Sequence, residues 1–135
     1  MAVLSPLAHK NGQSLIEVVA TMAIAVLIIT GLVFTAGEAI KNVQFSKNQA
    51  LATKYAEEGM EKTRAFRDQN TWSNFKRSCP TYNAGAVPAP FTRTINCLDE
   101  GDAEKRKITI TVSWIDSSGS HQSQLTSFLS NWVTK

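Results

Sequence analysis

The stretch VVATMAIAVLIITGLVFTAG, residues 18–37, decides the fold because it runs for 20 residues without a charged side chain. A helix rises about 1.5 Å per residue, so this stretch would span roughly 30 Å, the thickness of the hydrocarbon core of a bilayer. A cleaved secretory signal is the alternative, but its apolar part has only about 7–15 residues and precedes the cleavage site. The sequence therefore predicts a transmembrane helix.

The rest of the chain is polar, and its size and charge limit what it can do. At 135 residues it has room for one modest domain besides the membrane segment, since a domain typically takes about 100–200 residues. The formal net charge is +3. Without residues 1–12 it is +2, because Lys10 leaves and 13 basic residues then face 11 acidic ones. So mild an excess makes direct nucleic-acid binding an unlikely main function.

A second pattern precedes the apolar stretch: MAVLSPLAHKNG (1–12), followed by QSLIE (13–17). It resembles the prepilin leader and processing motif of type IV pilins and pseudopilins, in which a short leader ends in Gly, cleavage follows directly, and the fifth mature residue is Glu. Gly12 matches the residue before the cut, Gln13 the new N-terminus and Glu17 the acidic residue. The resemblance implies cleavage by a prepilin peptidase and modification of the N-terminus at Gln13.

This resemblance is specific over residues 12–35 and looser beyond them. Family members usually have Phe or Met where this chain has Gln13, which leaves open whether the new terminus is methylated or cyclises. Many major pilins also have a Pro in the second half of the anchor, where this chain has only Gly31 and Gly37 as points of flexibility. Both departures favour the minor-pilin or pseudopilin branch of the family.

Glu17 is the residue on which assembly would depend. It lies four residues after Gln13, about 6 Å along a helix axis, near the edge of the apolar stretch. A carboxylate at the bilayer centre costs about 2.5–3.5 kcal/mol on insertion scales, so an embedded one needs a partner. The resemblance implies that this partner is the N-terminal amine of a neighbouring subunit's Gln13. In the alternative, Glu17 extends to the lipid headgroups and pairs with nothing.

Beyond the membrane, the helix is expected to continue as a stem. Residues 38–68 contain no Pro and are rich in helix formers. Apolar or small residues recur there at spacings of three and four: Ile40, Val43, Ala52, Tyr55, Ala56, Gly59, Met60, Thr63 and Phe66. We expect the part from Tyr55 to Phe66 to pack on the head. The predicted segments are a leader (1–12), a transmembrane and assembly segment (13–37), a stem (38–70) and a β-rich head (71–135).

The head is expected to contain a small antiparallel sheet. Residues 69–75 are interpreted as a helix exit and 79–90 as an irregular loop, because Pro80, Pro88 and Pro90 fall close together. Three strands are predicted, over 91–97, 107–115 and 121–132. The second places Ile108, Ile110, Val112 and Trp114 on one face, and the third places Leu125 and either Phe128 or Leu129 inward. The fold class is therefore α+β: a long N-terminal helix whose second half is covered by a small C-terminal sheet.

Cys79 and Cys97 are the only two cysteines, and the predicted topology places both on the oxidising side of the membrane. A disulfide is the leading interpretation. Two reduced thiols are the alternative, and two ligands alone make a poor metal site. The bridge would tie the loop after the stem to the first strand.

The sequence contains no catalytic constellation, so we expect neither an enzyme nor a cofactor. His9 lies in the leader and His121 beside a turn, which leaves no nucleophile with a positioned base. Asp99, Asp102 and Glu104 could hold Ca²⁺, but they lack the pattern of a known calcium loop, and a solvated hairpin connection is favoured. Residues 105–107 form a small basic cluster that could contact DNA phosphates, but an exposed strand entry needs no such role and is favoured.

These features predict a minor pilin or pseudopilin of a type IV pilus, a competence system or a type II secretion-like filament. The expected partners are the prepilin peptidase, other pilin subunits and the membrane, which the chain crosses once. The expected location is the bacterial inner membrane with the head outside the cytoplasm, and then a surface or periplasmic filament. The alternative is a single-pass membrane protein whose extracytoplasmic head binds a partner without forming a filament.

Overall fold

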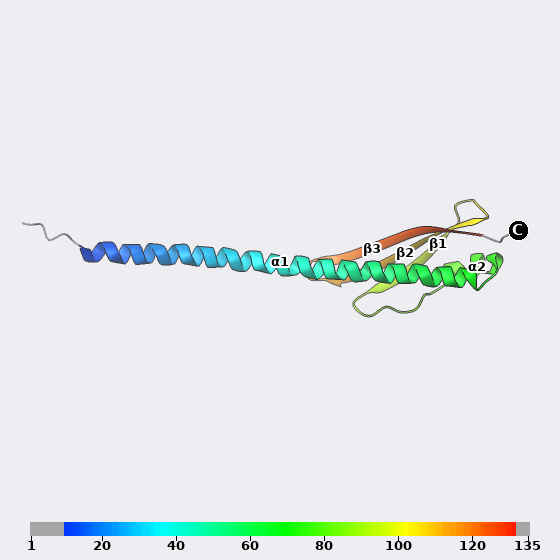
Figure 1. Cartoon of the computed structure of the whole chain (residues 1–135), viewed down its shortest axis with the longest axis horizontal. Coiled ribbons are helices and arrows are strands. Elements are labelled where there is room, and N and C mark those ends of the chain that lie inside the picture. Colours follow the sequence, from blue (N-terminus) through cyan, green and yellow to red (C-terminus); the bar gives the residue numbers. More distant parts are fainter. Residues whose placement is uncertain (1–9, 132–135) are drawn as a thin grey trace, which may run out of the picture. The chain divides into compact units, whose positions relative to one another are not determined.

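The structure is a computed structural model that describes the backbone of residues 10–131 and the side chains of residues 14–131 (Figure 1). Its first element is the helix α1, Lys10–Asp68. Two compact units meet between Val43 and Gln44, so α1 contributes to both. Gly12 and Gln13 lie outside the residues whose side chains are described, so the predicted cleavage site remains a prediction.

The first unit is helical throughout its described part, and all of its side chains from Ser14 to Val43 are exposed. Because residues 18–37 carry no charged side chain, this stretch has no polar face to turn toward water. Three hydroxyls are satisfied within the helix: those of Thr21, Thr30 and Thr35 donate to the carbonyl oxygens of Val18, Val26 and Leu32. The long apolar helix predicted from the sequence is confirmed.

The second unit combines residues 44–68 of α1 with an antiparallel sheet of three strands, in the order β1-β2-β3 (Figure 1). The strands are β1 (Thr92–Leu98), β2 (Lys105–Asp116) and β3 (Gly119–Ser130). β1 is shifted by one residue from its predicted range, β2 begins two residues earlier and ends one later, and β3 begins two residues earlier. β3 ends at Ser130, and Trp132, the predicted end of the third strand, lies outside the described residues. The α+β class, with the sheet packed on the second part of the helix, is confirmed.

The core lies between this part of α1 and the inner face of the sheet. The alternation predicted for β2 is confirmed, since Ile108, Ile110, Val112 and Trp114 are all at most 1% exposed. They meet a helical face of small and medium residues, Ala52, Ala56, Met60 and Thr63. Gly59 lies on the same face, where a Cβ atom would come within 2.9 Å of Arg93 Cδ. In β3 the half-buried Leu125 and Leu129, which is 3% exposed, pack on the core, whereas Phe128 points outward and is 56% exposed.

The segment after α1 differs from the prediction, because residues 69–75 are not simply a helix exit. A short helix α2, Trp72–Ser78, follows α1 and leads into the 3-10 turn η1, Cys79–Thr81. The Thr71 side chain caps α2 by accepting a hydrogen bond from the Asn74 backbone N–H. Phe75 is completely buried and draws the helix onto the core. A helix of seven residues owes its stability to such a tertiary contact rather than to its own propensity.

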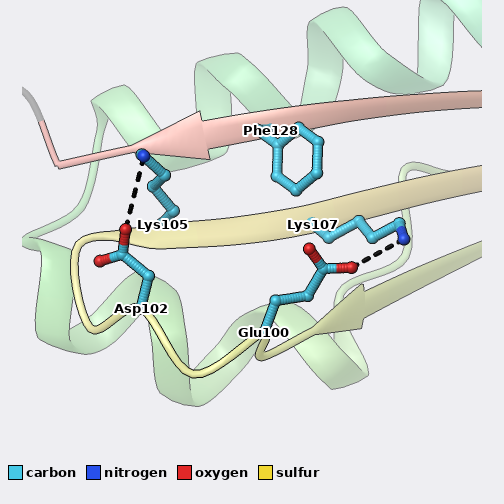
Figure 2. Close-up of a pocket in the computed structure, with 5 residues that line it drawn as sticks. All are labelled: Glu100, Asp102, Lys105, Lys107 and Phe128. Carbon is cyan, nitrogen blue, oxygen red and sulfur yellow. Dashed lines mark hydrogen bonds and ion pairs between the residues drawn. The ribbon is translucent and has the colours of Figure 1, made fainter.

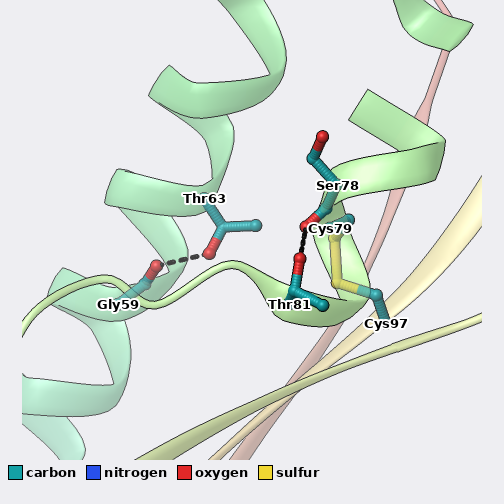
Figure 3. Close-up of a disulfide and its surroundings, with 6 residues drawn as sticks. All are labelled: Gly59, Thr63, Ser78, Cys79, Thr81 and Cys97. Carbon is teal, nitrogen blue, oxygen red and sulfur yellow. Dashed lines mark hydrogen bonds between the residues drawn. A yellow bond between two sulfur atoms is a disulfide. The ribbon is translucent and has the colours of Figure 1, made fainter. Parts of the chain in front are cut away.

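A disulfide joins Cys79 in η1 to Cys97 in β1, as predicted (Figure 3). The two Cα atoms are 5.9 Å apart, and Cys79 is fully buried. Nearby, the Thr63 hydroxyl donates to the Gly59 carbonyl oxygen at 2.8 Å, which satisfies a buried polar group within α1. The bridge therefore fixes the segment after α2 to the first strand of the sheet.

Candidate functional site

The first candidate site is the surface of α1 between residues 14 and 43. Its large apolar side chains are open to the surroundings, with Leu15, Ile16, Leu27 and Phe34 each about 70% exposed. Contiguous apolar surface on this scale marks an interaction with membrane or protein, because water disfavours it by about 25 cal/mol per Å². The helix has the length and composition to cross a membrane, which suits a single-pass anchor.

Glu17 is the only charged residue between positions 14 and 37. Its side chain is exposed, and it forms no ion pair or hydrogen bond with any residue whose side chain is described. The nearest basic residue after it in the sequence, Lys41, pairs instead with Glu38 at 2.9 Å. A partner for Glu17 must therefore come from outside residues 14–131, either from the chain's own beginning, from the surroundings or from a second chain.

The acidic connection between β1 and β2, residues 99–104, is the second candidate. Each of three carboxylates faces one basic residue at the start of β2: Asp99 pairs with Arg106 at 2.6 Å, Glu100 with Lys107 at 2.7 Å, and Asp102 with Lys105 at 3.5 Å. Among the residues that the structure describes, no group of three or more His, Cys, Asp or Glu side chains could hold a metal ion. The calcium alternative thus finds no ligand set there.

The same connection borders a pocket of about 400 Å³ on the outer side of the sheet (Figure 2). It is lined by Glu100, Asp102, Lys105, Lys107 and Phe128. The pKa of the Asp102 carboxyl is lowered, first by the backbone N–H of Glu104 and then by Lys105. Because the charged groups around the pocket are paired with one another, they offer a ligand no uncompensated charge. The same pairs set one carboxylate against each basic residue of the cluster 105–107.

A third cluster lies at the turn between β2 and β3, and no local sequence pattern indicates it. Phe45 contacts both Trp114 and His121, with ring centroids 6.3 and 5.1 Å apart. His121 Nε2 lies 3.0 Å from an Asp116 carboxylate oxygen. The pKa of Asp116 is lowered, chiefly because its carboxylate accepts a hydrogen bond from the Ser118 backbone N–H and secondarily because of His121. This is a packed turn that joins the hairpin to α1.

Comparisons with protein-family models, with curated proteins and with solved structures found no match. A functional argument for this chain therefore rests on its own residues. Of the predicted site residues, Cys79 and Cys97 are brought together, Glu17 lies exposed on an apolar helix, and Gly12 and Gln13 precede the described side chains.

Proposed function

We propose that this chain is a type IV pilin-like subunit, a minor pilin or pseudopilin, which is cleaved after Gly12 and assembles into a filament through its N-terminal helix. The observation that carries the proposal is the lone carboxylate of Glu17 at the start of an exposed helix that is otherwise uncharged as far as Gly37. The spacing of Gly12, Gln13 and Glu17 supports it, since cleavage would create a free amine four residues before that carboxylate.

The mechanism follows from the two environments that the helix would occupy. Before assembly the apolar surface of residues 18–37 is covered by lipid, and in a filament it is covered by the same segment of neighbouring subunits. Glu17 pairs with the amine of a neighbour's Gln13, which removes the cost of an unpaired carboxylate in apolar surroundings. This pairing specifies the axial offset between subunits, while the apolar contacts supply most of the association energy.

The second unit supports placing the head outside the cytoplasm. A disulfide persists in oxidising compartments such as the bacterial periplasm or the cell surface, and thiols are kept reduced in the cytosol. The Cys79–Cys97 bridge closes a loop with a sequence separation of 18. In the chain-entropy model such a loop contributes about 3 kcal/mol. With the head outside, the N-terminus of α1 faces the cytoplasm, where the prepilin peptidase would act on the leader in the inner membrane.

Processing is tested by N-terminal peptide and intact-mass spectrometry on the protein recovered from its host's membranes or filaments. We expect a chain that begins at Gln13, with or without one methyl group. A chain that still begins at Met1, or one cut beyond residue 37, would contradict the proposal. A chain that begins at Met1 would indicate a single-pass membrane protein whose head binds a partner. A chain cut beyond residue 37 would indicate a secreted head.

Assembly is tested separately with Glu17→Ala, which removes the carboxylate from the anchor. We expect the variant to remain in the membrane fraction and to be lost from sheared filaments or from cross-linked oligomers. Thr21→Ala is the matched control, because it removes one polar side chain one turn further along the same helix and should assemble normally. If Glu17→Ala were incorporated as well as the control, the pairing mechanism would be wrong and the single-pass anchor would be preferred.

A further inference from the structure

The sheet of the second unit ends on two strands whose outer backbone edges are open. Within the part of the chain that the structure describes, no backbone group of β1 or β3 hydrogen-bonds outside the β1–β2 and β2–β3 ladders. On the outer face, hydroxyl and amide side chains lie side by side on the three strands, as in Thr94, Thr111 and Gln124. The row Leu98, Lys107 and Phe128 is the exception. An open strand edge is recognised by another extended backbone.

Neither edge is blunted by an exposed charge, a Pro or a bulge, although η1 lies against β1 through the Cys79–Cys97 bridge. The 12 residues of β3, GSHQSQLTSFLS, include no Lys, Arg, Asp, Glu or Pro, and they pair with β2 over 12 consecutive positions without a bulge. The seven residues of β1 include one charge, Arg93, but its side chain is turned under the sheet and is 1% exposed. It donates to the carbonyl oxygens of Tyr55, Ala84 and Gly85. Edge strands of proteins that remain monomeric are commonly blunted by charge, Pro or bulges.

The direction of the strands decides how two copies can meet. Both β1 and β3 are antiparallel to β2, so they run in the same direction as each other. Residues 44–68 of α1 also run with β3, because Phe45 contacts His121 at the start of β3. At the opposite end of the sheet, Trp72 just beyond α1 donates to the carbonyl oxygen of Ala103 before β2. A two-fold pairing of β3 with β3 would therefore turn the two α1 segments in opposite directions, whereas a pairing of β3 with β1 keeps them aligned.

We propose that β3 of one copy pairs in parallel with β1 of a second copy anchored in the same membrane, so that neighbouring heads share one sheet. The contact is heterologous, so each copy keeps a free β1 or β3 for the next one and the array can grow. On the outer face, Thr94 and Asn96 would lie opposite Gln122, Gln124 or Thr126, where hydroxyl–amide pairs are favourable and no like charges meet. The inference goes beyond the proposed function, because it requires only that two copies are anchored in the same membrane. It does not require that they form a filament.

Cross-linking between two differently tagged full-length chains tests the contact in host membranes. One chain carries Thr94→Cys and the other carries Gln122→Cys, Gln124→Cys or Thr126→Cys, which covers the possible registers. The thiol reagent is chosen to bridge adjacent strands, about 4.8 Å apart, but not alternate ones. The native cysteines do not interfere, since Cys79 and Cys97 are joined. We expect a dimer that contains both tags with at least one of the three β3 variants.

The matched control is Thr111→Cys, which lies in the same row and on the same face but on the middle strand. It should not cross-link to either edge. Any of four results would overturn the proposal. These are dimers between two Gln124→Cys chains, adducts with a different protein, cross-linking by Thr111→Cys at an equal yield, and the absence of any adduct. All substituted side chains are on the outer face, and retention of the Cys79–Cys97 bridge on a non-reducing gel reports that each variant has folded.

Charged substitutions distinguish pairing of these two strands from cross-linking by random collision. Asn96→Lys and Thr126→Lys, added to the two cross-linking chains, should together lower the yield roughly two- to five-fold, because like charges across neighbouring strands repel. Replacing Asn96→Lys by Asn96→Glu should restore the yield. A yield that ignores the sign of the charges would also contradict pairing of these two edges. Repeating the measurement with Glu17→Ala chains keeps the result independent of filament assembly.

Discussion

The two units of this chain share the helix α1, yet apolar side chains are exposed in the first unit and buried in the second. Between Ser14 and Val43 every described side chain is exposed, whereas in the second unit Trp114, Ile108 and Ile110 are almost completely covered. The second unit supplies its own apolar surroundings, while the first must obtain them from lipid or from other chains. Substitutions in the second unit should therefore alter its stability, and matched substitutions in the first should alter only its interactions.

The largest contrast is expected between Trp114→Ala and Leu27→Ala. Truncating Trp114, which is 1% exposed, should lower the free energy of unfolding of the second unit by about 3–5 kcal/mol. Leu27 is 73% exposed and should leave that value unchanged. Urea unfolding of the full-length protein in detergent, followed by circular dichroism, measures both. A similar loss for the two variants would show that the units are not energetically separate.

Removal of the disulfide comes next. Cys79→Ala combined with Cys97→Ala should destabilise the second unit by about 3 kcal/mol, the loop-closure contribution expected for a loop of this length. The same urea titration, with reduced wild-type protein as a second measurement, tests this value. Retention of the helix between residues 14 and 43 in the variant would show that the bridge stabilises only its own unit.

A pair of glycine substitutions sharpens the comparison within α1 itself. In Gly59→Ala the new Cβ would lie 2.9 Å from Arg93 Cδ and 3.2 Å from Ile110 Cδ1, so these side chains must shift, at a cost of about 1–3 kcal/mol. Around Gly31 nothing lies within 4 Å in the described structure, so Gly31→Ala should leave the second unit unaffected. Unchanged stability of Gly59→Ala would mean that the helix and the sheet do not approach each other as closely as described.

The smallest expected effect is on the stability of the second unit at low pH. The pKa of Asp116 is lowered by the Ser118 backbone N–H and by His121, so its contribution to stability is present above the unfolded pKa and is lost as the pH falls through the folded value. We expect the loss of stability below about pH 4 to be slightly less steep in Asp116→Asn. Glu57→Gln, at an exposed carboxyl that makes no ion pair among the described residues, is the control. Urea midpoints between pH 2 and 7 compare them, and identical slopes would contradict the expectation.

Much of this fold follows from the sequence because two patterns are unambiguous. Twenty uncharged residues predict the anchor, and the alternation from Ile108 to Trp114 predicts the central strand and its buried face. The inward residue of β3 stayed open between Phe128 and Leu129, since adjacent apolar residues fit either phase. Pairing with β2 decides it by placing Phe128 beside Lys107 on the outer face.

Other features depend on contacts between distant residues that local patterns do not encode. The helix α2 was missed because it is stabilised by burial of Phe75, and the ion pairs around residues 99–107 depend on the path of the connection. The two Cys residues were paired correctly because no other partner exists. The cleavage site and the role of Glu17 remain predictions from the motif, which the experiments above address.

The threonine hydroxyls of the first unit have a further consequence for a helix that would leave lipid for protein. Thr21, Thr30 and Thr35 each donate to a carbonyl oxygen of their own helix, so their hydrogen bonds require nothing from the medium. Acyl chains and the apolar side chains of a neighbour are then equivalent surroundings for these positions. Transfer between the two environments would break none of these bonds, so these hydroxyls would add nothing to the barrier.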